Sequence, residues 1–149
     1  LRPTDISAAI GNSQIKKLNH IIKIRKKNFK SIRKALLEDK SFSNKFDILE
    51  ENSSNSVVWF GIPIILKSTK KNYKAIVTNK LNKFGIVTRP LICGNFVNQP
   101  AIKLYNLKIN DDLKNADFID KNSFFIGLHN TLTTSKSINY IKKALFASL

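Results

Sequence analysis

The stretch from Val57 to Leu66 is the longest apolar run in the chain, and it limits the folds that the chain can adopt. It is too short for a membrane-spanning helix, which needs about 18 consecutive apolar residues. A short, nearly continuous apolar run is instead typical of a strand buried on both faces. We therefore expect a core strand here and no membrane partner.

Apolar residues recur at helical spacing on both sides of this run. Pro3-Thr4-Asp5 predicts a helix start with Thr4 or Asp5 as N-cap, and the helical pattern then continues to about Asp39. Gly11-Asn12 is its weakest point and predicts a kink or break there. Further helices are expected over 70–84, 113–121 and 135–149, with a helical turn over 100–105.

Three other segments are predicted to be strands, namely 46–50, 85–91 and 124–128, and a polar loop covers 51–56. Helices followed by strands and helices in this order predict an α+β fold, with helices packed on a small, mostly antiparallel sheet. A length of 149 residues fits one domain, 1–149, with a long helical segment at its N-terminus.

The formal net charge of +16 is compatible with a polyanionic partner. Nearly all of this charge is lysine scattered along the chain, however, and a coding bias toward A/T-rich codons gives the same profile. No pair of strands carries aromatic residues between basic ones, as many RNA-binding domains do. We therefore expect no nucleic-acid partner, although a basic nucleic-acid-binding module stays an alternative.

Cys93 is the single cysteine, which excludes an internal disulfide and any zinc or iron–sulfur site built on several cysteines. The two histidines have no acidic partner at short spacing, so no metal site is predicted. A reducing cytoplasm is the expected location, and no signal peptide is visible. The chain opens at Leu1 and contains no methionine, which indicates a domain or fragment of a longer protein.

Arg89 stands at the end of a predicted strand and is followed by a turn at Gly94-Asn95. A strand fixes the guanidinium, and a glycine lets backbone approach a ligand, so this pattern suits an anionic or polar ligand. An arginine in a surface salt bridge is the alternative interpretation.

His129 follows the predicted strand 124–128, at a position where ligand-facing groups often lie. A histidine hydrogen-bonded within a loop is the alternative, and His20 is predicted to be a surface residue. Cys93 has no base at a recognisable spacing, and the glycines form no phosphate-binding loop. The chain is therefore predicted to supply part of a site rather than a complete catalytic centre.

Several motifs together resemble the C-terminal small domain of the DegT–StrS family of sugar-nucleotide aminotransferases and dehydrases. The matching segments cover nearly the whole chain: Leu1 to Gly11 with Gln14 to Leu18, Arg25 with Asn28-Phe29, Trp59 to Ile64, Gly85 to Pro90, Gly94 to Phe96 with Gln99-Pro100, Asn115 to Asp117, and Gly127 to His129. The segment 85–100 resembles the branch of lipopolysaccharide 3-dehydrases and related keto-sugar aminotransferases.

The resemblance implies a fold-type I enzyme that uses pyridoxal 5'-phosphate (PLP), acts on a nucleotide-sugar substrate in surface polysaccharide biosynthesis, and works as a homodimer. PLP would be bound mainly by a large domain preceding Leu1, which would also carry the Schiff-base lysine or the histidine that replaces it. No catalytic residue is therefore expected in this chain. Amino transfer and dehydration are not separated.

The same resemblance implies that Arg89, Asn95 and His129 bind substrate, and that Arg2 lies near the cofactor phosphate or the substrate of the partner subunit. A non-catalytic α+β interaction domain on the same scaffold stays a further alternative. If a large domain is the neighbour, a contiguous apolar docking face is expected on this one.

Overall fold

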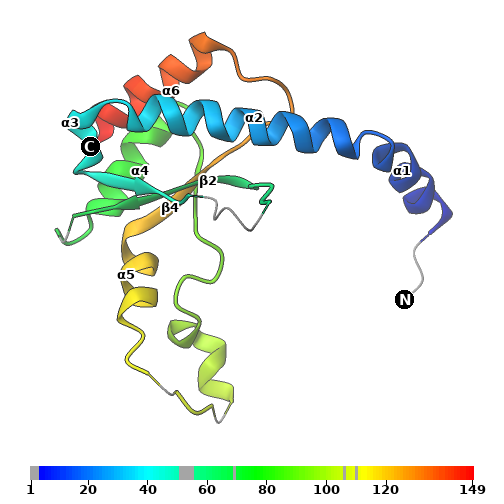
Figure 1. Ribbon diagram of the computed structural model, residues 1–149. Helices are drawn as coiled ribbons and strands as arrows, with labels where there is room; N and C mark the ends of the chain where they lie inside the picture. Colours follow the sequence, from blue (N-terminus) through cyan, green and yellow to red (C-terminus); the bar gives the residue numbers. More distant parts are fainter. Residues whose placement is uncertain (1–3, 51–55, 69, 106, 110) are drawn as a thin grey trace.

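The computed structural model describes residues 4–50, 56–68, 70–105, 107–109 and 111–149. The chain forms a four-stranded antiparallel sheet with helices against it, as the sequence predicts (Figure 1). The helices α2, α4 and α6 gather on one face of the sheet, and α5 leaves the other side with the segment that follows β3. The predicted α+β fold is confirmed.

The sheet has the strand order β1-β2-β4-β3. Its strands are β1 (Phe46–Ile48), β2 (Gly61–Leu66), β3 (Thr88–Pro90) and β4 (Ser123–Gly127). β2 pairs with β4 over five positions, from Gly61 opposite Gly127 to Ile65 opposite Ser123. Both strands are buried over nearly their whole length, which confirms the two-sided burial expected of the apolar run for residues 61–66. Its first four residues, 57–60, are half-buried or exposed.

The helices are α1 (Asp5–Ile15), α2 (Leu18–Leu37), α3 (Lys40–Ser43), α4 (Tyr73–Lys83), α5 (Lys114–Asn122) and α6 (Ser135–Ser148), with 3-10 turns η1 (Phe96–Asn98) and η2 (Pro100–Leu104). The core lies between the sheet and α2, α4 and α6. It includes Phe29, Ile32 and Leu36 of α2, Val77 and Leu81 of α4, Leu145 of α6, and Ile62, Ile64, Phe124 and Ile126 of the sheet. Each large apolar side chain buried here contributes about 1.5–3 kcal/mol.

The N-terminal helical segment is interrupted at Lys16-Lys17 rather than at the predicted Gly11-Asn12. Gly11 lies inside α1 because a single glycine raises the free energy of a helix by only about 1 kcal/mol and does not forbid it. The N–H of Lys17 donates to the carbonyl of Gln14, three residues back, and this tighter turn ends α1. Thr4 is the N-cap, as expected, and accepts from the Ser7 N–H.

Several predicted strands are longer than the observed ones. The segment 57–60 precedes β2, and β3 covers only three of the seven residues predicted for it. Gly85 has a φ of +73°, a conformation that suits glycine, and it follows the C-terminal end of α4. The predicted loop 51–56 lies mostly outside the described residues.

Two segments project away from the sheet and expose large apolar side chains (Figure 1). One is α1, which has no buried residue and exposes Ile6, Ile10 and Ile15. The other is the described part of 91–113, which exposes Ile92, Phe96, Leu104, Tyr105, Leu107 and Ile109. None of the helices in the described part of the chain combines the length and apolarity needed to cross a bilayer.

Candidate functional site

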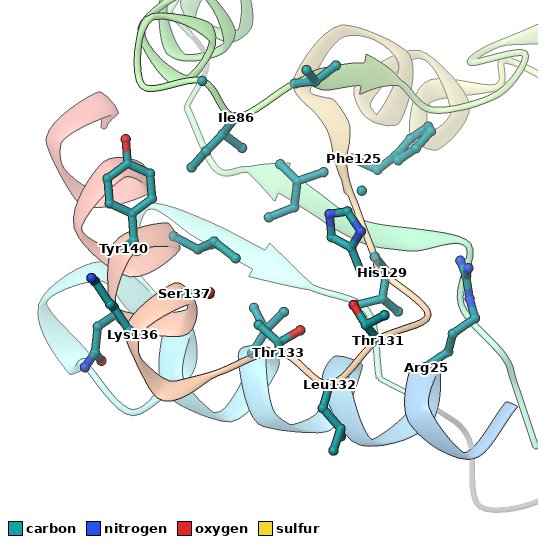
Figure 2. A pocket seen from close by; sticks show the side chains of 18 of the residues that line it. Arg25, Ile86, Phe125, His129, Thr131, Leu132, Thr133, Lys136, Ser137 and Tyr140 are labelled. Atoms are coloured by element: carbon teal, nitrogen blue, oxygen red, sulfur yellow. The ribbon is translucent and has the colours of Figure 1, made fainter. Parts of the chain in front are cut away.

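A cavity of about 1280 Å³ opens where β3, β4, the loop after β4 and the first turns of α6 meet (Figure 2). Ligand pockets usually measure about 300–1,000 Å³, so this one accommodates a large ligand. Its lining is mostly apolar, with Ile86, Phe125 and Leu132 among the contributors. Its charged lining residues include Arg25, Arg89, Lys136 and Lys143. No aspartate or glutamate is among the described residues that line it.

Arg89 and His129 line this one cavity. Within β4, Phe124 and Ile126 belong to the core, so Phe125 and Gly127 face the other way. Arg89 lies opposite Phe125 in the β3–β4 ladder, and opposite residues in such a pair share a face. His129 follows the end of β4 by two residues, and both Arg89 and His129 are exposed.

Arg25 of α2 forms another part of the lining and holds the segment that precedes β2. Its Nε and Nη2 donate to the carbonyl of Trp59 at 3.1 and 3.0 Å, and Nη2 also donates to the carbonyl of Phe60 at 2.6 Å. The guanidinium lies 5.8 Å from the centre of the Phe60 ring. One turn further along α2, Phe29 stacks on Trp59.

Asn28 of α2 is buried and bonds the loop that carries His129. Its Nδ2 donates to the carbonyls of His129 and Thr131 at 3.1 and 2.7 Å, and its Oδ1 accepts from the Thr133 N–H at 2.9 Å. In Figure 2 the His129 ring lies between Phe125 and this loop, with Arg25 and Tyr140 toward opposite ends of the cavity.

Asn95 is not among the residues that line the cavity. It is buried, and its Nδ2 donates to Oδ1 of Asp117 at 2.7 Å while its Oδ1 accepts from the Val97 N–H as the cap of η1. Asn98 donates to the same Asp117 oxygen at 2.9 Å. The Asn95 amide is thus hydrogen-bonded to α5, and the role of Asn95 in substrate binding stays a prediction.

The turn at Gly94 packs against α5 as well. Gly94 has a φ of +50°, and a Cβ there would lie 2.0 Å from Oδ1 of Asp120. Hydrogen bonds from Asn95 and Asn98, with a smaller contribution from the Lys121 charge, lower the pKa of Asp117 below its ordinary value. The sequence predicts that this glycine lets the backbone approach a ligand, whereas the close approach in the structure is to α5, and the approach to a ligand stays a prediction.

The remaining sequence predictions are placed as follows. Arg2 lies outside the described residues, so its role stays a prediction. His20 is exposed on α2, and Cys93 is an exposed free thiol. Among the residues that the structure describes, no three His, Cys, Asp or Glu side chains gather closely enough to hold a metal ion.

The sequence-based interpretation gave Arg25 and Asn28 no role of their own. A signal was present for Asn28, because it lies beside Phe29 on the buried stripe that continues through Ile32. A buried amide needs hydrogen-bond partners, so an asparagine at such a position indicates a contact with other backbone. The spacing of residues in the sequence could not show which backbone this is, because it lies about 100 residues further along the chain.

The family model described as the DegT/DnrJ/EryC1/StrS aminotransferase family matches residues 1–146. The chain belongs to this family. It is 36% identical over 130 residues to the GDP-4-keto-6-deoxy-D-mannose 3-dehydratase of Yersinia pseudotuberculosis, covering 87% of this chain and 32% of that protein. It is 30% identical over 141 residues to a lipopolysaccharide biosynthesis protein of Salmonella typhimurium, covering 95% of this chain and 31% of that protein.

Among solved structures, the chain is similar to the Escherichia coli GDP-4-keto-6-deoxy-D-mannose-3-dehydratase with bound hydrated PLP. The TM-score is 0.84 at 30% identity, over 97% of this chain and 36% of that one. The chain thus spans about a third of the length of the relatives it matches, and its fold is that of the C-terminal region of fold-type I PLP enzymes.

Proposed function

We propose that this chain is the substrate-facing C-terminal part of a PLP-dependent enzyme that acts on a nucleotide-linked keto-deoxy sugar. The enzyme would work as a cytoplasmic homodimer in the biosynthesis of lipopolysaccharide or a related surface polysaccharide. Family membership and the matched relatives support this assignment. Both the Yersinia and the Escherichia coli proteins are named as 3-dehydratases, which favours dehydration over amino transfer.

The observation that carries the proposal is the charge of the cavity. Arg89, Lys136 and Lys143 line a space whose described lining includes no carboxylate, and such a space attracts anions. The diphosphate of a nucleotide-linked sugar is the anionic group in question. A guanidinium binds phosphate oxygens with two parallel hydrogen bonds, so Arg89 is the residue that we assign to this contact. His129, which lines the same cavity, would bond the sugar or a phosphate oxygen.

The described cavity does not by itself fit PLP. Its described lining offers no carboxylate to pair with the pyridinium nitrogen, a partner that PLP enzymes commonly supply. In our proposal the cofactor, which acts as an electron sink, is held mainly by the part of the enzyme that this chain does not span. The residues of this chain then bind and orient the substrate and help to exclude water from it.

Replacing Arg89 by alanine in the full-length enzyme tests the proposal. Loss of one charge-assisted contact is expected to lower kcat/KM about tenfold to a thousandfold. Arg89→Lys keeps the positive charge but not the two parallel donors of the guanidinium, so its kcat/KM should lie between those of the parent enzyme and Arg89→Ala. Steady-state kinetics with the nucleotide-linked sugar measures this.

Arg33→Ala is the matched control, because Arg33 is on α2, pairs with Glu50 at 3.3 Å and is not among the cavity-lining residues. It removes a guanidinium elsewhere and should leave kcat/KM close to that of the parent enzyme. Unchanged kinetics in Arg89→Ala, or equal losses in both variants, would remove Arg89 from the proposed site.

A further inference from the structure

The segment between β4 and α6 carries His129 and forms part of the cavity lining, yet it contains no helix or strand. Three of its backbone groups bond one side chain, that of Asn28. The carbonyls of His129 and Thr131 accept from Nδ2 and the N–H of Thr133 donates to Oδ1, at 3.1, 2.7 and 2.9 Å. A single amide therefore fixes both the start and the end of a five-residue stretch.

Asn28 itself has little freedom to move. It is 2% exposed and lies in the middle of α2, next to Phe29, which packs in the core and stacks on Trp59. The amide uses both hydrogens of Nδ2 and one acceptor position of Oδ1, and only an asparagine or glutamine side chain offers that combination. The longer glutamine would not fit without displacing the loop, because buried sites accommodate extra methylenes poorly.

We propose that Asn28 is a positioning residue for His129: it sets where the imidazole stands in the cavity by holding the backbone of residues 129–133. This inference rests on the proposed function, in which His129 contacts the substrate. Asn28 acts only through the loop, because it is not among the cavity-lining residues. Loss of the amide would free the His129 carbonyl and allow the imidazole to occupy several places, which weakens a contact that depends on geometry.

Two variants separate the roles of the amide. Asn28→Ala removes all three bonds. Asn28→Asp keeps an oxygen that accepts from the Thr133 N–H, but it puts a second carboxylate oxygen against the carbonyls of His129 and Thr131. The shape of the asparagine side chain is thus conserved, while the hydrogen bonds donated to the carbonyls of His129 and Thr131 are lost. Asn19→Ala is the control, because Asn19 is exposed on the same helix.

Amide hydrogen exchange at Thr133, followed by NMR in the full chain, tests the geometry without relying on activity. We expect about tenfold faster exchange in Asn28→Ala and parent-like exchange in Asn28→Asp and Asn19→Ala. Parent-like exchange at Thr133 in Asn28→Ala would overturn the inference, whatever the kinetics.

A double-mutant cycle in the full-length enzyme tests the route through His129. Asn28→Ala and Asn28→Asp are each expected to lower kcat/KM about tenfold, and Asn28→Ala combined with His129→Ala should be no slower than His129→Ala alone. A merely structural asparagine would instead give losses that multiply, and that result would also overturn the inference. Parent-like kinetics in His129→Ala would remove His129 from the proposed function, whereas the Thr133 exchange would still report separately on the loop.

Discussion

Gly61 and Gly127 lie opposite each other in the ladder between β2 and β4, but only one of the two positions is crowded. A Cβ on Gly61 would lie 2.4 Å from Cδ2 of Phe125 and 2.7 Å from the carbonyl oxygen of Ile126. A Cβ on Gly127 would meet nothing within 4 Å. The glycine in β2 therefore allows Phe125 to pack against that strand on the face that Arg89 shares.

Gly61→Ala should lower the free energy of unfolding by about 1–3 kcal/mol, because the backbone carbonyl of Ile126 cannot turn aside as a flexible side chain can. Gly127→Ala, the matched control, should change it by about 0.5 kcal/mol or less. Urea unfolding of the two variants and the parent measures both values. Equal effects at the two positions would contradict the close packing described for Gly61.

Arg89 and His129, which the sequence singled out near predicted strand ends, both line the cavity, while their role in substrate binding stays a prediction. Arg89 and His129 adjoin apolar segments, and the period of two along a strand is readable from the chain. The hydrogen bonds of Asp117 were not recognised, because its partners Asn95 and Asn98 come from a turn about 20 residues away. For the same reason, the hydrogen bond that joins Asn95 to α5 was not predicted.

At the scale of single elements, α5 is fastened to the turn before η1 through Asp117. Two amides donate to one carboxylate oxygen, and Lys121 lies 4.0 Å from the other. These contacts favour the charged carboxylate, which is why its pKa is lowered in the folded chain. A group whose pKa falls on folding stabilises the fold above its unfolded pKa, and this contribution disappears as the pH falls through the lower, folded value.

The stability of the chain should therefore fall between about pH 5 and the acid range below 3.8, in part through protonation of Asp117. Asp117→Asn keeps an acceptor for Asn95 and Asn98 but has no charge to lose. Its urea midpoint should accordingly depend less on pH over that interval than the parent midpoint does. Asp47→Asn is the control, because Asp47 lies on β1 and its carboxylate pairs with Lys67. Parallel pH profiles for Asp117→Asn and the parent would contradict this account.

Helices were predicted more accurately than strands, and the reason is physical. A helix such as α6 makes its backbone hydrogen bonds within itself, so its apolar spacing and its Thr134 cap already define its extent. A strand ends where its partner ends. β3 is limited to Thr88–Pro90 by its pairing with β4, and the segment 57–60 is held by Arg25 rather than by a neighbouring strand.

At the scale of the whole molecule, the exposed apolar residues concentrate on parts that project from the sheet. α1 exposes Ile6 and Ile10, and the segment 91–113 exposes Leu104 and Tyr105 (Figure 1). Surfaces of this kind commonly contact another domain or subunit. The sequence predicts one contiguous apolar docking face, whereas the exposed apolar residues lie on two separate segments. The docking face therefore stays a prediction.

The central claim is that the basic cavity receives the diphosphate of a nucleotide-linked sugar, and a crystal structure of the full-length enzyme with GDP tests it most directly. We expect diphosphate oxygens within hydrogen-bond distance of the Arg89 guanidinium, at about 2.7–3.2 Å, with His129 on the same side of the ligand. A structure in which GDP binds elsewhere, with Arg89 and His129 covered by other protein, would contradict the claim.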